Sequence, residues 1–96
     1  MITRQTFAEK RAQISCLAKA RRVSRVRVFG SVALGDNTPT SDVDFLVTSQ
    51  PGCTLFDLGG FLMDLKDLLS CPVDVITDDA LKPRLRSRVL AEAVLV

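Results

Sequence analysis

Two segments of the sequence decide the expected fold: RVRVFGS at residues 25–31 and SDVDFLV at residues 41–47. The first alternates charged and apolar side chains up to a glycine-serine pair, which predicts a strand that runs into a turn. The second alternates and then becomes wholly apolar, so we expect a second strand over 43–48, returned beside the first by a loop rich in turn formers. Side chains two apart on a strand leave the same face, so Asp42 and Asp44 are predicted to point the same way.

The paired carboxylates indicate a bound cation. Two like charges side by side on a buried strand are costly unless a cation or hydrogen-bond donors compensate them. Asp44 is followed at once by the apolar run 45–47, where a free charge is poorly placed. Magnesium fits such a pair, because it binds one or two carboxylates and completes its shell with phosphates and water. The alternative for Asp42 is an ordinary loop-end cap or an exposed position.

A third carboxylate lies in the short apolar segment 72–76, which is typical of a third strand. There Asp74 shares a face with Ile76 rather than with its apolar neighbours. If this strand lies beside that of Asp44, Asp74 can complete a second metal position or accept the proton of an attacking hydroxyl. The alternative is the exposed face of an edge strand.

Gly30 and Ser31 are candidates for phosphate contact. Gly30 lets the backbone approach a phosphate without an intervening Cβ, and Ser31 offers a hydroxyl and an amide at the start of a short helix expected over 31–34. A glycine-serine pair alone is more often an ordinary turn. Combined with three aspartates it predicts nucleotidyl transfer, in which a metal bridges a triphosphate and protein donors hold the phosphates in line.

Helical patterns flank these strands. Thr6 begins a capping-box pattern that predicts a helix over 7–21, and Thr54 is expected to cap a second helix. The apolar stripe of this second helix, expected in the core, comprises Leu55, Leu58, Phe61, Leu62, Leu65, Leu68 and Leu69. From Asp79 a last helical stretch is expected, interrupted near its start by Pro83.

These elements predict an α/β fold, a small mixed sheet of three or four strands flanked by helices, with the aspartates on one sheet face. Residues 93–96 either extend the last helix or form an edge strand. The 96 residues fit one domain over 1–96, without room for a second domain that holds an acceptor. We therefore expect a partner to supply the acceptor.

Composition narrows the class of protein. Apolar residues make up 47% and charged residues 25%, and no apolar run approaches the roughly 18 residues that span a bilayer. The first residues lack the apolar segment of a signal peptide, so the expected location is cytoplasmic. Cys16, Cys53 and Cys71 are widely spaced and no histidine accompanies them, which argues against a zinc site or a disulfide framework.

The net charge of +2 is too small to indicate nucleic-acid binding, but basic residues cluster near the end, at Lys82, Arg84, Arg86 and Arg88. This cluster is either a solvated helix face or a docking face for an acidic partner or RNA. The chain has no Trp or Tyr, so base stacking is unsupported and a protein is favoured over RNA.

The motifs Gly30-Ser31, Ser41-Asp42-Val43-Asp44 and Val73-Asp74-Val75 resemble the signature of the DNA polymerase β-like nucleotidyltransferase superfamily. With its short length, the whole chain is similar to the minimal nucleotidyltransferases, small stand-alone prokaryotic domains. By this resemblance, Asp42 and Asp44 are the Mg²⁺ ligands, Asp74 is the third carboxylate and Gly30 with Ser31 contacts the triphosphate.

The resemblance also implies a role as the antitoxin of a two-gene toxin–antitoxin pair, because members of this family are typically encoded beside a HEPN-domain protein. In that family AMP is transferred from ATP to a tyrosine of a HEPN-domain ribonuclease toxin, which silences it. Two alternatives are an antitoxin that acts by binding and occlusion, and a nucleotidyltransferase that acts on RNA or a small molecule with a separate acceptor subunit.

One departure concerns the glycine-serine turn, where the family often carries arginine at one or both of the positions that Val32 and Leu34 occupy here. Their absence removes cations that help to neutralise a triphosphate. Arg25, Arg27 or a residue of a partner are candidates to compensate for them.

Overall fold

The computed structural model describes residues 2–35, 38 and 42–96, with the side chain of residue 4 left aside. Its elements are α1 (Arg4–Ala20), β1 (Val23–Phe29), α2 (Ser31–Leu34), β2 (Val43–Ser49), α3 (Leu55–Leu69), β3 (Val73–Thr77), the 3₁₀ turn η1 (Asp78–Ala80), α4 (Pro83–Glu92) and β4 (Val94–Leu95). Most of the expected loop between β1 and β2, including Ser41, lies outside the described residues.

The strands form one mixed sheet in the order β3-β2-β1-β4. β1 is antiparallel to both β2 and β4, whereas β2 and β3 are parallel and are joined through α3. A parallel pair needs such a crossover, because a tight turn cannot return the chain to the same end of the sheet. This arrangement confirms the predicted fold class and the edge-strand alternative for residues 93–96.

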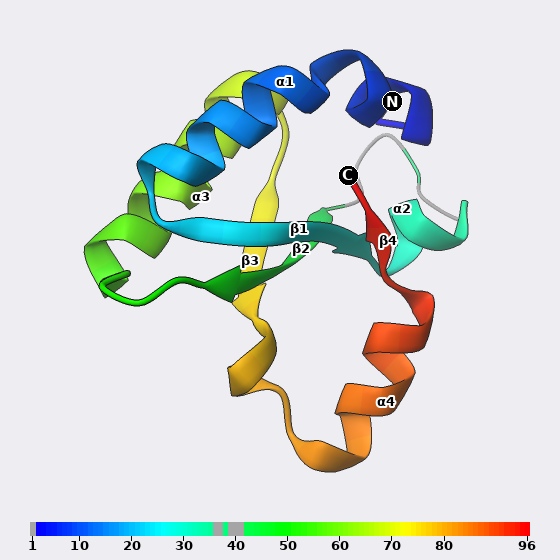
Figure 1. Cartoon of the computed structure of the whole chain (residues 1–96). Coiled ribbons are helices and arrows are strands. Elements are labelled where there is room, and N and C mark those ends of the chain that lie inside the picture. Colours follow the sequence, from blue (N-terminus) through cyan, green and yellow to red (C-terminus); the bar gives the residue numbers. More distant parts are fainter. Residues whose placement is uncertain (1, 36–37, 39–41) are drawn as a thin grey trace.

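Helices α1 and α3 cover one face of the sheet, and α4 lies on the opposite side (Figure 1). The core between these two helices and the sheet contains Phe7, Ile14, Ala18, Val23, Val28, Val43, Phe45, Val47, Phe61, Leu65, Leu69 and Val73. Phe7 of α1 meets Phe45 of β2 edge to face, with ring centroids 5.8 Å apart. Because Val43, Phe45 and Val47 face this core, the side chain of Asp44 leaves the other face of β2.

Two predicted helix boundaries and one predicted core residue were wrong. The first helix begins at Arg4 rather than 7, because the N–H of Thr3 donates to Thr6 Oγ1 at 3.2 Å and makes Thr3 the cap. Pro83 does not interrupt the last helix but starts it, where its missing N–H has no helical partner to lose. Leu55 is not in the core: it lies in the first turn of α3 and is 84% exposed.

Two glycines lie inside α3 despite their low helix propensity. A Cβ on Gly60 collides with the guanidinium of Arg21, whereas a Cβ on Gly59 meets no described atom within 4 Å. The missing Cβ of Gly60 thus lets Arg21 lie against the helix, where its Nε donates to Asp64 Oδ2 at 3.0 Å. This contact ties the end of α1 to α3.

Within the described part of the chain, no helix is both long enough and apolar enough to cross a membrane. Cys16, Cys53 and Cys71 are free cysteines.

Candidate active site

Asp44 and Asp74 lie directly opposite each other on the parallel strands β2 and β3. On the other side of β2, Phe29 is the register partner of Asp44, so one row of the sheet runs Phe29, Asp44, Asp74. β1 ends at this row, while β2 and β3 begin near it, and the turn at Gly30 therefore lies at the same end of the sheet as the aspartates. The topology brings together residues that are 30 positions apart in the sequence.

Gly30 packs against Asp44. Its backbone has φ 73° and ψ −149°, a conformation that is essentially restricted to glycine. A Cβ at this position meets Asp44 Oδ2 at 2.6 Å, which is closer than any real contact of this kind. Two independent features therefore require glycine at position 30: the backbone angles and the Asp44 carboxylate beside it.

Asp42 and Asp74 act electrostatically on Asp44. Burial, and then the negative charges of Asp74 and Asp42, raise the pKa of Asp44 above its ordinary value. Asp42 directly precedes β2 and is exposed, and Asp74 is exposed on the edge strand β3. Asp42 and Asp74 are therefore exposed, as their alternative interpretations from the sequence state. The charges of both residues nevertheless act on the half-buried Asp44. Concentrated negative charge of this kind attracts a cation.

The donor set fits a magnesium ion that is shared with a substrate. Among the described residues, no group of three His, Cys, Asp or Glu side chains is arranged to hold a metal by itself. Mg²⁺ does not need such a cage, because it is commonly bound through one or two carboxylates, phosphate oxygens and water. Asp42 and Asp44 carry the hard carboxylate oxygens that could hold such an ion, and Gly30 lies against the Asp44 carboxylate.

The positions that depart from the family pattern have different environments. Val32 is buried in the core at 3% exposure, whereas Leu34 is 55% exposed at the end of α2. The backbone N–H of Leu34 donates to the carbonyl of Gly30 at 3.1 Å, which closes the turn. Ser31 begins α2 and is half-buried.

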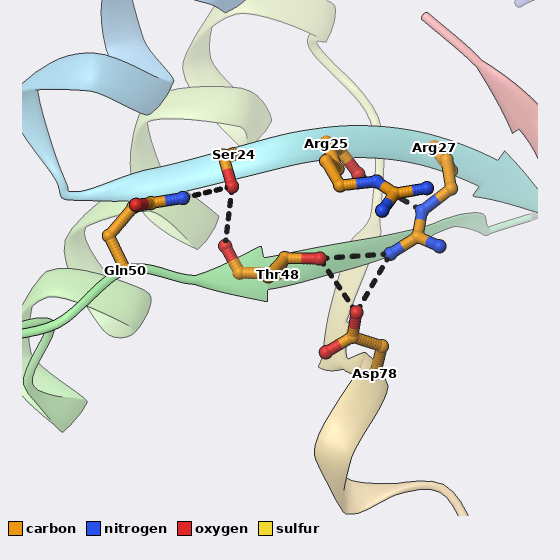
Figure 2. Close-up of polar contacts among 6 residues, drawn as sticks. All are labelled: Ser24, Arg25, Arg27, Thr48, Gln50 and Asp78. Atoms are coloured by element: carbon orange, nitrogen blue, oxygen red, sulfur yellow. Dashed lines mark hydrogen bonds and ion pairs between the residues drawn. The ribbon is translucent and has the colours of Figure 1, made fainter.

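A second polar cluster lies on the aspartate face of the sheet, and the sequence does not predict it. Arg27 donates through one NH₂ group to Thr48 Oγ1 and to Asp78 Oδ2, both at 3.2 Å (Figure 2). The hydroxyl of Thr48 donates to the same Asp78 oxygen at 2.6 Å, and Arg27 Nε donates to the carbonyl of Arg25 at 3.0 Å. Among the residues that the structure describes, Arg27 is the sole charged residue that is buried.

A β-bulge gives Arg27 this orientation. Between Ser24 and Arg27 the strand holds two residues opposite one residue of β2, and Arg25 adopts a positive φ of 49°. Arg27 then becomes the register partner of Leu46, two residues from Asp44 on the same face. Its guanidinium is bound at Asp78, so Arg27 is a poor substitute for the missing turn arginines.

The Asp78 carboxylate is held in its charged form. Burial acts to raise its pKa, but hydrogen bonds from Thr48 and Arg27, with the charges of Arg27 and Arg86, hold the pKa of Asp78 below its ordinary value. Asp78 begins η1, directly after β3. The cluster therefore joins the segment that leads to α4 to the centre of the sheet.

Comparison with known protein families agrees with this geometry. Residues 10–96 match the family model described as a nucleotidyltransferase domain. Two Methanocaldococcus jannaschii proteins, each named "putative protein adenylyltransferase", are similar in sequence. One is 40% identical over 72 residues, which cover 75% of this chain and 77% of the relative. The other is 35% identical over 60 residues, which cover 62% of this chain and 61% of the relative.

Two solved structures are similar in fold. A structure described as a "putative minimal nucleotidyltransferase" superposes with a TM-score of 0.88 at 38% identity, over 99% of this chain and 97% of that one. A toxin–antitoxin crystal structure with AMP-PNP has a TM-score of 0.72 over 88% of this chain and 69% of that one, and at 19% identity it shows the fold alone. The chain thus belongs to the nucleotidyltransferase domain family and is a transferase with the fold of a minimal nucleotidyltransferase.

Proposed function

We propose that this nucleotidyltransferase transfers AMP from ATP to a hydroxyl of a partner protein, with Asp42, Asp44 and Asp74 as its catalytic carboxylates. The main observation in support of this proposal is that Asp44 of β2 lies opposite Asp74 of β3, with Gly30 packed against Asp44. The names of the two archaeal relatives support a protein as the acceptor and adenylate as the transferred group.

In this proposal Asp42 and Asp44 hold Mg²⁺, which when bound neutralises the triphosphate and polarises the phosphorus under attack. Gly30 and Ser31 contact the triphosphate from the turn. Asp74 takes the proton of the acceptor hydroxyl as its oxygen bonds to the α-phosphorus. The bond from that phosphorus to the bridging oxygen breaks, and pyrophosphate leaves.

We further propose that the partner is a HEPN-domain toxin, that a tyrosine of it accepts AMP, and that the chain is its antitoxin. The motif resemblance supports this role, and the toxin–antitoxin complex with AMP-PNP has the same fold. An antitoxin that acts by occlusion is the second candidate. Two observations favour it: Val32 and Leu34 replace the family's arginines, and Arg27 is bound to Asp78.

The test is to incubate the chain with ATP, Mg²⁺ and the product of the neighbouring gene, and to record intact masses of both proteins. We expect the partner to gain one or more AMP units, and expect the gain to vanish in an Asp42→Asn, Asp44→Asn double variant. An Asp67→Asn, Asp79→Asn variant is the matched control, because both residues are exposed and lie outside the row.

The occlusion candidate predicts a different pattern. The partner then keeps its mass and still co-purifies with the chain. If occlusion is the mechanism, we also expect the Asp42→Asn, Asp44→Asn variant to protect cells from the toxin. Label that appears on RNA instead of protein would indicate a different acceptor class.

A further inference from the structure

Helix α4 has no partner within the described part of the chain. None of its residues is buried, and no other helix or strand makes more than marginal contact with it. It stands apart from α1 and α3, across the sheet from them (Figure 1). Ten residues are too few for a stable isolated helix in water, so α4 depends on contacts at its ends or on a covering partner.

Both ends of α4 are fastened to β1 at Arg27. Before the helix, the Arg27 side chain binds Asp78 in η1 (Figure 2). After the helix, the backbone of Leu95 in β4 is the register partner of Arg27, and the N–H of Val96 donates to the Val26 carbonyl at 3.0 Å. These attachments hold α4 on the side of the sheet that carries Asp44 and Asp74.

The exposed surface of α4 combines apolar and basic side chains. Leu85 and Val89 are one turn apart and form a short apolar ridge, and Leu85 is 44% exposed. At 100° per residue, Arg84 and Arg88 flank the ridge on one side and Arg86 flanks it on the other, while Lys82 lies at the N-cap. All four are exposed, and Arg88 keeps 78% of its side chain exposed despite an ion pair with Glu92.

We propose that this basic ridge of α4 is the docking surface for an acidic polypeptide segment whose apolar side chains cover Leu85 and Val89. Charge complementarity identifies the occupant: four cations around an apolar ridge match carboxylates around apolar side chains. RNA fits less well, because α4 has no aromatic side chain for base stacking and places leucine at its centre.

The occupant of the basic ridge is the acceptor protein, and this identification rests on the proposed function. Docking on α4 places the acceptor over the face that carries the aspartate row. The sheet orients the helix through Arg27, and the helix then holds the acceptor protein on this face.

The test measures binding rather than activity. Fluorescence anisotropy of a labelled random copolymer of glutamate and tyrosine, which offers carboxylates and apolar rings, is recorded with the full chain at rising salt. We expect binding that weakens with salt, and an Arg84→Glu, Arg88→Glu variant that binds at least about tenfold more weakly. These two arginines are chosen because Arg86 also acts on Asp78.

Arg11→Glu, Lys19→Glu is the matched control, with the same change in net charge at exposed positions of α1. We expect it to bind the copolymer within about twofold of the wild type, and expect Leu85→Asn to weaken binding without a change in charge. Equal losses in the α1 and α4 variants would overturn the proposal. The proposal would also be overturned if the wild-type chain bound a single-stranded RNA oligonucleotide through Arg84 and Arg88, and bound it more tightly than the copolymer.

The two proposals fail separately. If the wild type transfers no AMP, the proposed function fails, while binding of the copolymer still reports on α4. If the α4 variant modifies the neighbouring gene product with unchanged KM for that protein, the docking proposal fails and the enzymatic proposal stands.

Discussion

The guanidinium of Arg27 lies 3.2 Å from the carboxylate of Asp78, although the two residues are 51 positions apart. The side chains are 9% and 22% exposed, so solvent screens this pair far less than a surface pair. The same Arg27 is the register partner of Leu95 in β4. One residue of β1 therefore anchors both ends of the segment that carries α4.

Replacing Asp78 with Asn leaves the Arg27 charge buried with weaker partners. We expect the free energy of unfolding at neutral pH to fall by about 1–3 kcal/mol, the range for hydrogen bonds to charged groups. The pKa of folded Asp78 is below the ordinary value, so its contribution is complete above about pH 4 and is lost as the pH falls through the folded-state pKa. Urea unfolding from neutral pH to about pH 3 measures this difference.

The control for this prediction is Asp79→Asn, at the exposed neighbouring position. It should leave the free energy of unfolding within about 0.5 kcal/mol of the wild type. An Asp78→Asn protein as stable as this control would show that the Arg27 contact does not fasten the segment.

Ionisation of Asp44 lowers the stability of the fold, whereas ionisation of Asp78 raises it. Burial, with the charges of Asp74 and Asp42, raises the pKa of Asp44, so the ionised form destabilises the fold. The cost is absent below the ordinary pKa of about 3.9, develops as the pH rises, and is complete above the folded-state pKa. We therefore expect Asp44→Asn to unfold at a higher temperature than the wild type at neutral pH without added metal. A lower transition temperature in calorimetry would contradict this.

Gly30→Ala tests the contact between the turn and Asp44. Gly35→Ala is the comparison variant, because Gly35 has φ 77° and ψ 13°, the left-handed region in which alanine costs about 1–2 kcal/mol. Gly30 has ψ −149°, so alanine there also incurs the larger cost of a conformation that is essentially restricted to glycine. A Cβ on Gly30 collides with Asp44, whereas one on Gly35 meets no described atom within 4 Å. Transfer rates of folded protein should fall much further in Gly30→Ala. Equal losses would indicate that the Asp44 contact is unimportant.

Restoring the family's arginines should have opposite outcomes at two positions. Leu34→Arg places a cation on an exposed site beside the turn and should raise kcat/KM for ATP roughly two- to fivefold. Val32→Arg buries a charge in the core and should lower the free energy of unfolding by more than about 3 kcal/mol. Steady-state kinetics and urea unfolding distinguish these effects, and a stable Val32→Arg protein would contradict the burial argument.

Much of the site is predictable because it depends on short-range patterns. The strand ending at Gly30, the paired Asp42 and Asp44, and Asp74 in a third strand follow from alternation and turn chemistry. A helix between the second and third strands favours a parallel pair, which places Asp74 near Asp44. Which residues bind substrate stays a prediction.

The remaining features depend on contacts that no local pattern encodes. The bulge in β1 sets the register that turns Arg27 toward Asp78, and neither residue is unusual in its own segment. Leu55 fits the apolar period of α3 yet lies in its first turn, beyond the edge of the sheet core. A proline at a first helical position and one inside a helix look alike until the start of the helix is known, which explains the error at Pro83.

The central claim is that Asp42, Asp44 and Asp74 form a magnesium–nucleotide site. Its most direct test is calorimetric titration of a non-hydrolysable ATP analogue into the chain. We expect binding with Mg²⁺ that is lost with excess EDTA, lost in Asp42→Asn, Asp44→Asn, and retained in the exposed control Asp67→Asn, Asp79→Asn. Binding that persists without a divalent ion, or in the Asp42→Asn, Asp44→Asn variant, would contradict the claim.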